Sequence, residues 1–176
     1  MEKILMTGEA MGRTFSRLAH EIIEKNEELS SVVLIGVLRR GVPIAEEISK
    51  KIYDFSGKNI PVGTLDISHY RDDIAEKRYF PDVRAHSIDF ELQDKCVILV
   101  DDVIFTGRTV RAAIEAIFDI ARPRCIRLLA LVDRGHRELP IKPDYVGKNV
   151  PTSLSEKVVV HMKKYDGEES VKICEE

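Results

Sequence analysis

Residues 97–110, VILVDDVIFTGRTV, constrain the fold more than any other segment of this chain. An unbroken apolar run ends there on two acidic residues, and a short turn of Thr and Gly leads into the Ala-rich segment 110–121, which has helical periodicity. Such a run is typical of a strand that is buried on both faces, as in parallel sheets covered by helices. In these sheets, ligands bind beyond the carboxyl ends of the strands. The segment therefore predicts an α/β fold with a functional site near residues 101–109.

The rest of the chain continues the alternation of strands and helices, which predicts one domain spanning 1–176 around a mainly parallel sheet. The polar, weakly periodic residues after 70 predict a long loop, and such loops are usually functional. Helices are predicted for 8–26, 44–55 and 110–121, and strands for 31–37, 62–70, 96–102, 126–134, 144–147, 156–162 and 171–176.

Composition excludes several classes of protein. The 176 residues are 44% hydrophobic and 32% charged, without an apolar run near the roughly 20 residues that a membrane helix needs. The N-terminal MEKILMTGEAMGRTF lacks a secretory pattern, and Cys96, Cys125 and Cys174 have neither disulfide nor zinc spacing. We therefore expect a cytoplasmic protein with no membrane partner. The net charge of −3 predicts no general affinity for nucleic acids, although a local basic face remains compatible with RNA binding.

Each part of the 101–109 turn suits a sugar that carries a phosphate. Backbone N–H groups at a turn and a helix start bind phosphate, Gly107 allows close approach, and the hydroxyls of Thr106 and Thr109 add hydrogen bonds. Asp101 and Asp102 are suited to accept hydrogen bonds from ribose hydroxyls. The alternative is an ordinary strand end followed by a helix cap. Neither a GxxxxGK[ST] nor a GxGxxG motif occurs in the chain.

The same segment resembles the signature of the type I phosphoribosyltransferases. Further similar stretches are LAHEIIE (18–24), IGVLRRG (35–41), YRDD (70–73) and LVDRGHRELPIKPDYVGKNVPTSLSEKV (131–158), so the resemblance covers nearly the whole chain. The stretch 131–158 narrows the resemblance to the PyrR group, which are pyrimidine-operon attenuators with uracil phosphoribosyltransferase activity. The resemblance implies the type I phosphoribosyltransferase fold, with a mobile lid at about 70–90 and a hood at about 133–158 over the C-terminal edge of the sheet.

The resemblance also implies roles for individual residues in binding 5-phosphoribosyl 1-diphosphate (PRPP) and uracil. The ribose is assigned to the two aspartates, the 5-phosphate to 106–109, the diphosphate to the LRRG loop and the lid, and the base to the hood. The substrate-binding residues are Arg40, Gly41, Tyr70, Arg71, Asp101, Asp102, Thr106, Gly107, Arg108, Thr109, Asp133, Arg134, Tyr145 and Val146; Arg40, Arg71, Asp101 and Asp102 are the catalytic ones. The alternatives are a solvated loop at Arg39–Arg40, an exposed hairpin at Tyr70–Arg71, and core positions for Tyr145 and Val146.

The identity of residue 105, a Phe, indicates which bases are disfavoured as substrates and whether a protein acid or base takes part in the reaction. The 6-oxopurine enzymes of this superfamily have an Asp at the matching position, which exchanges a proton with the purine ring, whereas a phenyl ring performs no acid–base chemistry. Hypoxanthine and guanine are therefore disfavoured, and catalysis is expected to depend on positioning and electrostatics. Mg²⁺ is implied with the diphosphate and is expected to be held mainly through substrate and water, without an all-protein metal site.

The PyrR resemblance implies a second activity, binding of a pyrimidine-operon leader mRNA that is promoted by UMP or UTP. The matching residues fall in two groups, Arg17, His20 and Lys25 in the first helix, and His136, Arg137 and Lys142 in the hood. A solvated charged face is the alternative, and Glu24 weakens the basic character of the first group. A phosphoribosyltransferase of another base specificity without an RNA role also remains open. We expect a homo-oligomer.

Overall fold

The computed structural model describes residues 2–72 and 86–175. The predicted lid falls mostly outside this part of the chain, and only its flanks, 70–72 and 86–90, are within it. The described residues form two sheets, one central and one built from the two ends of the chain. The predicted site lies at one edge of the central sheet.

The central sheet has six strands in the order β4-β3-β2-β5-β6-β7. The strands β3, β2, β5, β6 and β7 are parallel, and only the short β4 runs antiparallel to its neighbour β3. Their bounds are Val32–Val37 (β2), Val62–Leu65 (β3), His86–Ser87 (β4), Cys96–Ile104 (β5), Cys125–Asp133 (β6) and Tyr145–Asn149 (β7). This arrangement confirms the predicted α/β fold, and it brings the carboxyl ends of the parallel strands to one edge.

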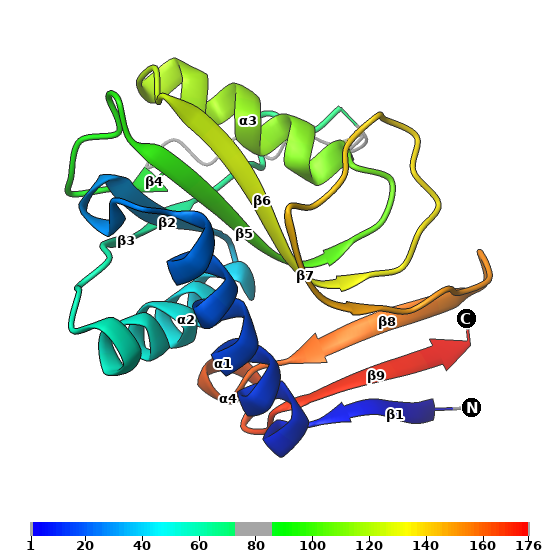
Figure 1. Cartoon of the computed structure of the whole chain (residues 1–176). Coiled ribbons are helices and arrows are strands. Elements are labelled where there is room, and N and C mark those ends of the chain that lie inside the picture. The colour runs from blue at the N-terminus through cyan, green and yellow to red at the C-terminus, as the bar shows by residue number, and fades with distance from the viewer. Residues whose placement is uncertain (1, 73–85, 176) are drawn as a thin grey trace.

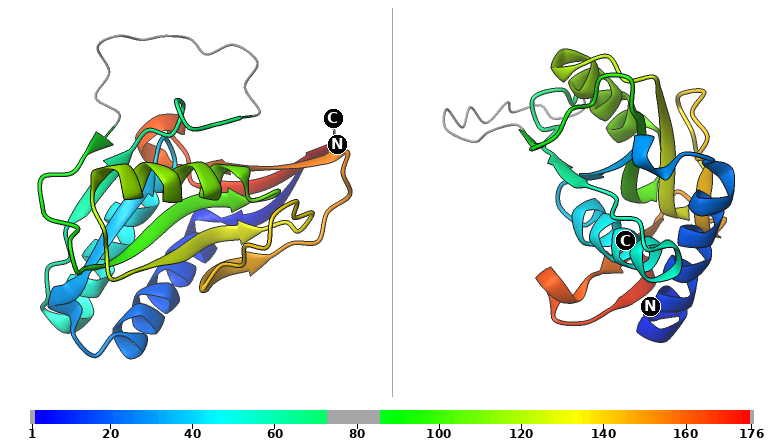
Figure 2. Two further views of the ribbon diagram at one scale, coloured as in Figure 1. Left: turned by 90° about the horizontal axis from the view of Figure 1, so that it is seen from above. Right: turned by 60° about the vertical axis from the view of Figure 1, so that its left-hand side comes forward.

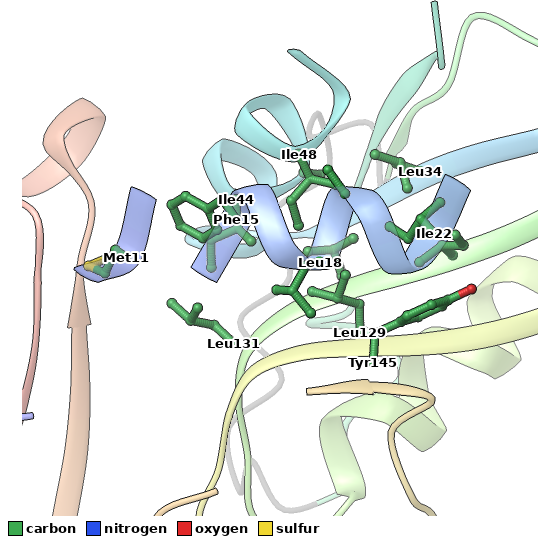
Figure 3. Packing of buried hydrophobic residues seen from close by; sticks show 14 of the residues in the cluster. Met11, Phe15, Leu18, Ile22, Leu34, Ile44, Ile48, Leu129, Leu131 and Tyr145 are labelled. Carbon is green, nitrogen blue, oxygen red and sulfur yellow. The ribbon is translucent and has the colours of Figure 1, made fainter. Parts of the chain in front are cut away.

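Helices cover both faces of this sheet, as Figure 1 shows. The helices α1 (Gly8–Lys25) and α2 (Gly41–Ser56) pack on one face, and α3 (Arg108–Ile120) packs on the other. Figure 3 shows the first layer from close by, where Leu18 and Ile22 of α1 lie against Leu129 and Tyr145 of the sheet. All four are fully buried, so the apolar periodicity of α1 is explained by its contact with the sheet.

A second, antiparallel sheet joins the two ends of the chain in the order β1-β9-β8. Its strands are Glu2–Thr7 (β1), Glu156–His161 (β8) and Ser170–Glu175 (β9); the short helix α4 (Lys163–Asp166) connects the last two. Glu2 pairs with Cys174, so the two termini lie side by side (Figure 2). The sequence pattern predicts β8 and β9 but not β1, because the partner of β1 is almost the whole chain away.

One predicted strand needs a corrected bound. The strand predicted for 62–70 ends at Leu65, because Asp66 accepts hydrogen bonds from the backbone and hydroxyl of Ser68 and starts a turn. The range predicted for the hood, 133–158, contains β7, which belongs to the central sheet. A 3-10 helix at Leu29–Ser31 precedes β2. No helix within the described part of the chain is long and apolar enough to cross a membrane.

Candidate functional site

Two acidic residues, Asp101 and Asp102, lie near the carboxyl end of the central strand β5, which continues to Ile104. The Asp101 carboxylate accepts a hydrogen bond from the backbone N–H of Asp102 at 2.9 Å, and the Asp102 carboxylate accepts one from Val103 at 2.8 Å. Burial raises the pKa of Asp101 well above its ordinary value, and the Asp102 charge raises it further. Burial also raises the pKa of Asp102. The ionised pair is poorly compensated, so hydrogen-bond donors or cations are favoured at this point.

The turn after β5 forms the first of two adjoining hollows. Gly107 has a φ of 94°, in the left-handed region that glycine favours, and α3 begins at the next residue. The backbone carbonyl of Thr106 accepts a hydrogen bond from the N–H of Glu138 at 2.9 Å, which joins the turn to the loop after β6. The hollow has a volume of about 280 Å³ and is lined by Arg71, Asp101, Val103, Ile104, Phe105, Thr106, Gly107, Arg108, Thr109, Val110 and Glu138.

The loop between β2 and α2 forms the second hollow, of about 340 Å³. The peptide bond between Leu38 and Arg39 is cis. Gly41 begins α2 so close to β5 that a Cβ there would lie 2.3 Å from the carbonyl oxygen of Val100. The lining residues are Val37, Leu38, Arg39, Arg40, Asp66, Ile67, Ser68, Arg71, Asp101, Asp102, Val103 and Thr109.

The two hollows share Arg71, Asp101, Val103 and Thr109, so they form one continuous cradle. A helix N-terminus lies at one end, arginines lie at the other end, and the buried carboxylates lie between them. Helix starts bind phosphate, arginine forks bind diphosphate, and carboxylates accept hydrogen bonds from sugar hydroxyls. The structure therefore brings together eight of the predicted residues: Arg40, Arg71, Asp101, Asp102, Thr106, Gly107, Arg108 and Thr109.

A third hollow, of about 420 Å³, lies in the loop after β6 and includes the predicted residues Asp133 and Arg134. The Arg134 guanidinium lies 4.0 Å from the centre of the Phe105 ring and donates hydrogen bonds to Thr152, Ser153 and Glu156. Arg134 thus fixes the loop that surrounds this hollow. The hollow also contains His136, whose ring meets the Phe105 ring edge to face at 5.8 Å.

Three residues predicted for substrate binding lie elsewhere. Tyr145 is fully buried against α1, and its hydroxyl accepts a hydrogen bond from the Asn26 amide, so it has the core position that was the alternative to substrate binding. Val146 pairs with Ala130 inside the sheet. Tyr70 donates a hydrogen bond to Asp119 of α3 at 2.7 Å, which anchors the start of the predicted lid.

The residues predicted to bind RNA differ in what they contact. Arg17 is paired with Glu21, and Lys25 donates to the carbonyl oxygen of Asp144. Arg137 donates hydrogen bonds to the Ile141 and Phe105 carbonyls and pairs with Asp133 at 2.6 Å. Its guanidinium therefore joins the hood to the cradle.

The remaining three RNA candidates have exposed side chains. His20 is exposed and stacks on Phe55 of α2, with ring centroids 4.1 Å apart. His136 is exposed, although one ring nitrogen lies 2.6 Å from the Thr152 carbonyl oxygen. Lys142 is exposed.

Among the residues that sequence reasoning missed are two acidic side chains that pair with arginines of the cradle, Asp166 and Glu138. Asp166 of α4 pairs with Arg40, and Glu138 pairs with Arg108 at 2.6 Å. No local motif marks Asp166, because it reaches the site only through the second sheet. Glu138 lies inside the DRGHRELP stretch, and the resemblance of that stretch to the family is the signal that could have identified it.

The cradle fits a magnesium ion that arrives with a diphosphate. Within residues 2–72 and 86–175, no cluster of three or more His, Cys, Asp or Glu side chains could hold a metal by itself. The adjacent carboxylates of Asp101 and Asp102 have pKa values raised by burial, so a cation beside them would relieve an unfavourable charge. Mg²⁺ prefers oxygen ligands and retains waters, which is compatible with this small donor set.

The fold and the continuous cradle define a phosphoribosyltransferase. The family described as "Phosphoribosyl transferase domain" matches residues 3–174. The chain is 52% identical to the Bifunctional protein PyrR of Pelotomaculum thermopropionicum, covering 97% of this chain and 94% of the relative. It is 53% identical to the protein of that name from Clostridioides difficile, covering 97% of each. The chain therefore belongs to the PyrR family of phosphoribosyltransferases.

Solved structures of hypoxanthine phosphoribosyltransferases share the fold. The enzyme of Staphylococcus aureus superposes with a TM-score of 0.70 at 17% identity, covering 99% of this chain and 92% of that one. The hypoxanthine-guanine enzyme of Bacillus anthracis has a TM-score of 0.71 at 20% identity, covering 98% and 97%. At this identity the likeness concerns the fold alone.

Proposed function

We propose that this chain transfers a phosphoribosyl group from PRPP to uracil, giving UMP and diphosphate, and that it also regulates a pyrimidine operon by binding its leader mRNA. The continuous cradle carries the enzymatic part of the proposal. The regulatory part is supported by the full-length similarity to proteins named bifunctional.

In the proposed reaction, the backbone of 106–109 and the first turn of α3 bind the 5-phosphate. Asp101 and Asp102 accept hydrogen bonds from the ribose hydroxyls and face the positive charge that develops on the sugar. Arg40 and Arg71 bind the diphosphate and stabilise its charge as the bond to C1 of the ribose breaks. The ring nitrogen of uracil bonds to C1 as the bond from C1 to the diphosphate oxygen breaks, and the proton of that nitrogen passes to water or to the departing diphosphate, because the phenyl ring of Phe105 cannot accept it.

Asp101 and Asp102, acting through water, would help to hold Mg²⁺, which would supply positive charge to the diphosphate. The buried carboxylates act on the sugar and through water, and Arg40 and Arg71 provide the cationic groups of the chain itself. The reaction requires that water be kept from the cradle, because water would otherwise react with the sugar cation.

The test of the enzymatic part is diphosphate release from PRPP with each free base in turn. We expect activity with uracil and little with hypoxanthine or guanine, because the phenyl ring of Phe105 cannot exchange a proton with a purine ring. Activity on hypoxanthine but not on uracil would reject the substrate and favour a phosphoribosyltransferase of another specificity. A matched variant, Phe105→Leu, keeps an apolar side chain and should leave uracil preferred.

The regulatory part is supported by the way α1 meets β7. Arg17 and Lys25 donate hydrogen bonds to carbonyl oxygens of residues 144–147, so the basic residues of α1 adjoin the strand that follows the hood loop. Arg137 reaches from that loop to the Phe105 carbonyl at the cradle. A nucleotide bound in the cradle can therefore affect the basic residues of the hood through the contact between Arg137 and the Phe105 carbonyl.

A gel-shift titration of a pyrimidine-operon leader RNA, with and without UMP or UTP, tests this part. We expect tighter binding with nucleotide and a loss of affinity as salt is raised. Equal affinity for a scrambled RNA would reject sequence-specific regulation. The RNA and nucleotide partners imply a cytoplasmic protein, and we propose a homo-oligomer, which sedimentation of the free protein will test.

A further inference from the structure

Two consecutive residues of the short helix α4, Tyr165 and Asp166, contact the loop between β2 and α2. The guanidinium of Arg40 donates from Nε and Nη2 to the two carboxylate oxygens of Asp166, at 3.3 and 2.9 Å. The guanidinium of Arg39 lies 5.0 Å from the centre of the Tyr165 ring. Both arginines of the proposed diphosphate loop are thus held by a segment that lies more than 120 residues further along the chain.

The Arg40–Asp166 pair has the geometry of a strong interaction. Two parallel hydrogen bonds join the planar groups, which is the fork arrangement that fixes direction as well as distance. Asp166 is itself held, because its carboxylate accepts a hydrogen bond from the backbone N–H of Met162 at 2.7 Å. The Asp166 side chain is 16% exposed and that of Arg40 is 34% exposed, so the pair is more protected from solvent than an ordinary surface ion pair.

The pairing leaves part of the Arg40 guanidinium uncommitted to Asp166. Nε and Nη2 are used, while Arg40 also lines the second hollow beside Asp102. A planar guanidinium anchored on one edge presents its remaining N–H groups in a fixed direction. Without the anchor, a long side chain samples several rotamers and loses this orientation on average.

We infer that Asp166 is a positioning residue, which holds Arg40 in the orientation that binds the diphosphate of PRPP. The inference rests on the proposed function and adds a residue from the second sheet to the binding of that group. The second sheet therefore contributes to the site as well as joining the termini, because α4, which connects β8 and β9, contacts the diphosphate loop through Asp166 and Tyr165.

A purely structural role for α4 is the competing explanation, and a neighbouring pair provides the control. Lys164 lies 3.0 Å from Glu46 of α2, with both side chains about half exposed. Lys164→Ala removes an ion pair between α4 and α2, close to the Arg40–Asp166 pair, and leaves Arg40 and Asp166 unchanged. Asp166→Asn keeps the size of the side chain and an oxygen that can accept from Met162, so the fold should be retained.

The experiment measures binding of PRPP with Mg²⁺ by calorimetry in the absence of base, together with steady-state kinetics and thermal unfolding. We expect Asp166→Asn to weaken PRPP binding and to raise its KM by about tenfold, with a smaller change in kcat. Lys164→Ala should bind PRPP as the wild type does. In an Arg40→Ala background, Asp166→Asn should have no further effect on binding, because it acts through Arg40.

Unchanged PRPP binding in Asp166→Asn, or an equal and additive loss in the Arg40→Ala background, would overturn the inference. An equal loss in Lys164→Ala would point to general disturbance of α4 and would overturn it as well. Binding of PRPP is measured without base, so a wild type that binds PRPP but does not use uracil refutes only the proposed substrate. A wild type that does not bind PRPP refutes the proposed function and this inference together.

Discussion

The guanidinium of Arg17 in α1 donates a 2.6 Å hydrogen bond to the carbonyl oxygen of Gly147 in β7. The same nitrogen reaches the Val146 carbonyl at 3.2 Å, while the other terminal nitrogen pairs with Glu21. Because β7 is the last strand of the central sheet that residues 2–72 and 86–175 form, its outer edge has carbonyl groups that face no further strand of this part of the chain. Arg17 therefore donates hydrogen bonds to backbone carbonyl groups of the edge strand β7, in addition to its proposed contact with RNA.

Replacement of Arg17 by Ala should lower both stability and RNA affinity. We expect the free energy of unfolding to fall by about 1 kcal/mol, because two carbonyl groups lose a charged donor but regain water. Lys142→Ala is the matched control, since Lys142 is exposed and its loss should change stability by less than about 0.5 kcal/mol while weakening RNA binding. Urea unfolding and gel shifts measure the two effects. Equal stability of both variants would contradict the edge role of Arg17.

Asp101→Asn should stabilise the protein while removing activity. Burial raises the pKa of Asp101 in the folded state, so the ionised form opposes folding, and this cost develops as pH rises from the unfolded pKa of about 4 toward the raised folded value. We expect a gain of about 1–2 kcal/mol at pH 7 and a smaller gain at pH 4. The kcat for transfer should fall at least about 100-fold. A variant that is less stable at pH 7 than the wild type would refute the assigned cost.

Gly41→Ala should be strongly destabilising and should disrupt the diphosphate loop. The added Cβ would lie 2.3 Å from the Val100 carbonyl oxygen, so α2 or β5 must shift, at a cost of about 3 kcal/mol. Gly12→Ala is the control, because its Cβ meets nothing within 4 Å and it lies inside α1. That change should stabilise the protein by about 0.5–1 kcal/mol. Thermal unfolding distinguishes the two, and similar shifts would be inconsistent with the close approach at Gly41.

Cys96 should resist alkylation in the folded protein. It is fully buried, and burial raises the pKa of its thiol to about 11, so little of the reactive thiolate is present at pH 8. Cys174 is partly exposed and serves as the internal comparison. Iodoacetamide labelling followed by mass spectrometry should find Cys174 modified first and Cys96 modified only in denaturant. Early labelling of Cys96 in native buffer would contradict its burial.

The sequence by itself determined the α/β class and the core of the site. The apolar run into Asp101 and Asp102, and the Thr-Gly turn that follows, are local signals, because strand, turn and helix are set by neighbouring residues. The central strands β2, β5 and β6 and the three long helices were predicted within a few residues of their observed bounds. The resemblance of the whole chain to a family then placed Arg40 and Arg71 beside these aspartates.

Only the tertiary structure decided which side chains reach the cradle from a distance. Tyr145 has the expected sequence position for base contact, yet β7 directs it into the core against α1. Asp166 has no local signature, yet the pairing of β1, β9 and β8 brings its helix to Arg40. Both outcomes depend on contacts between residues more than 100 positions apart, which periodicity and short motifs cannot encode.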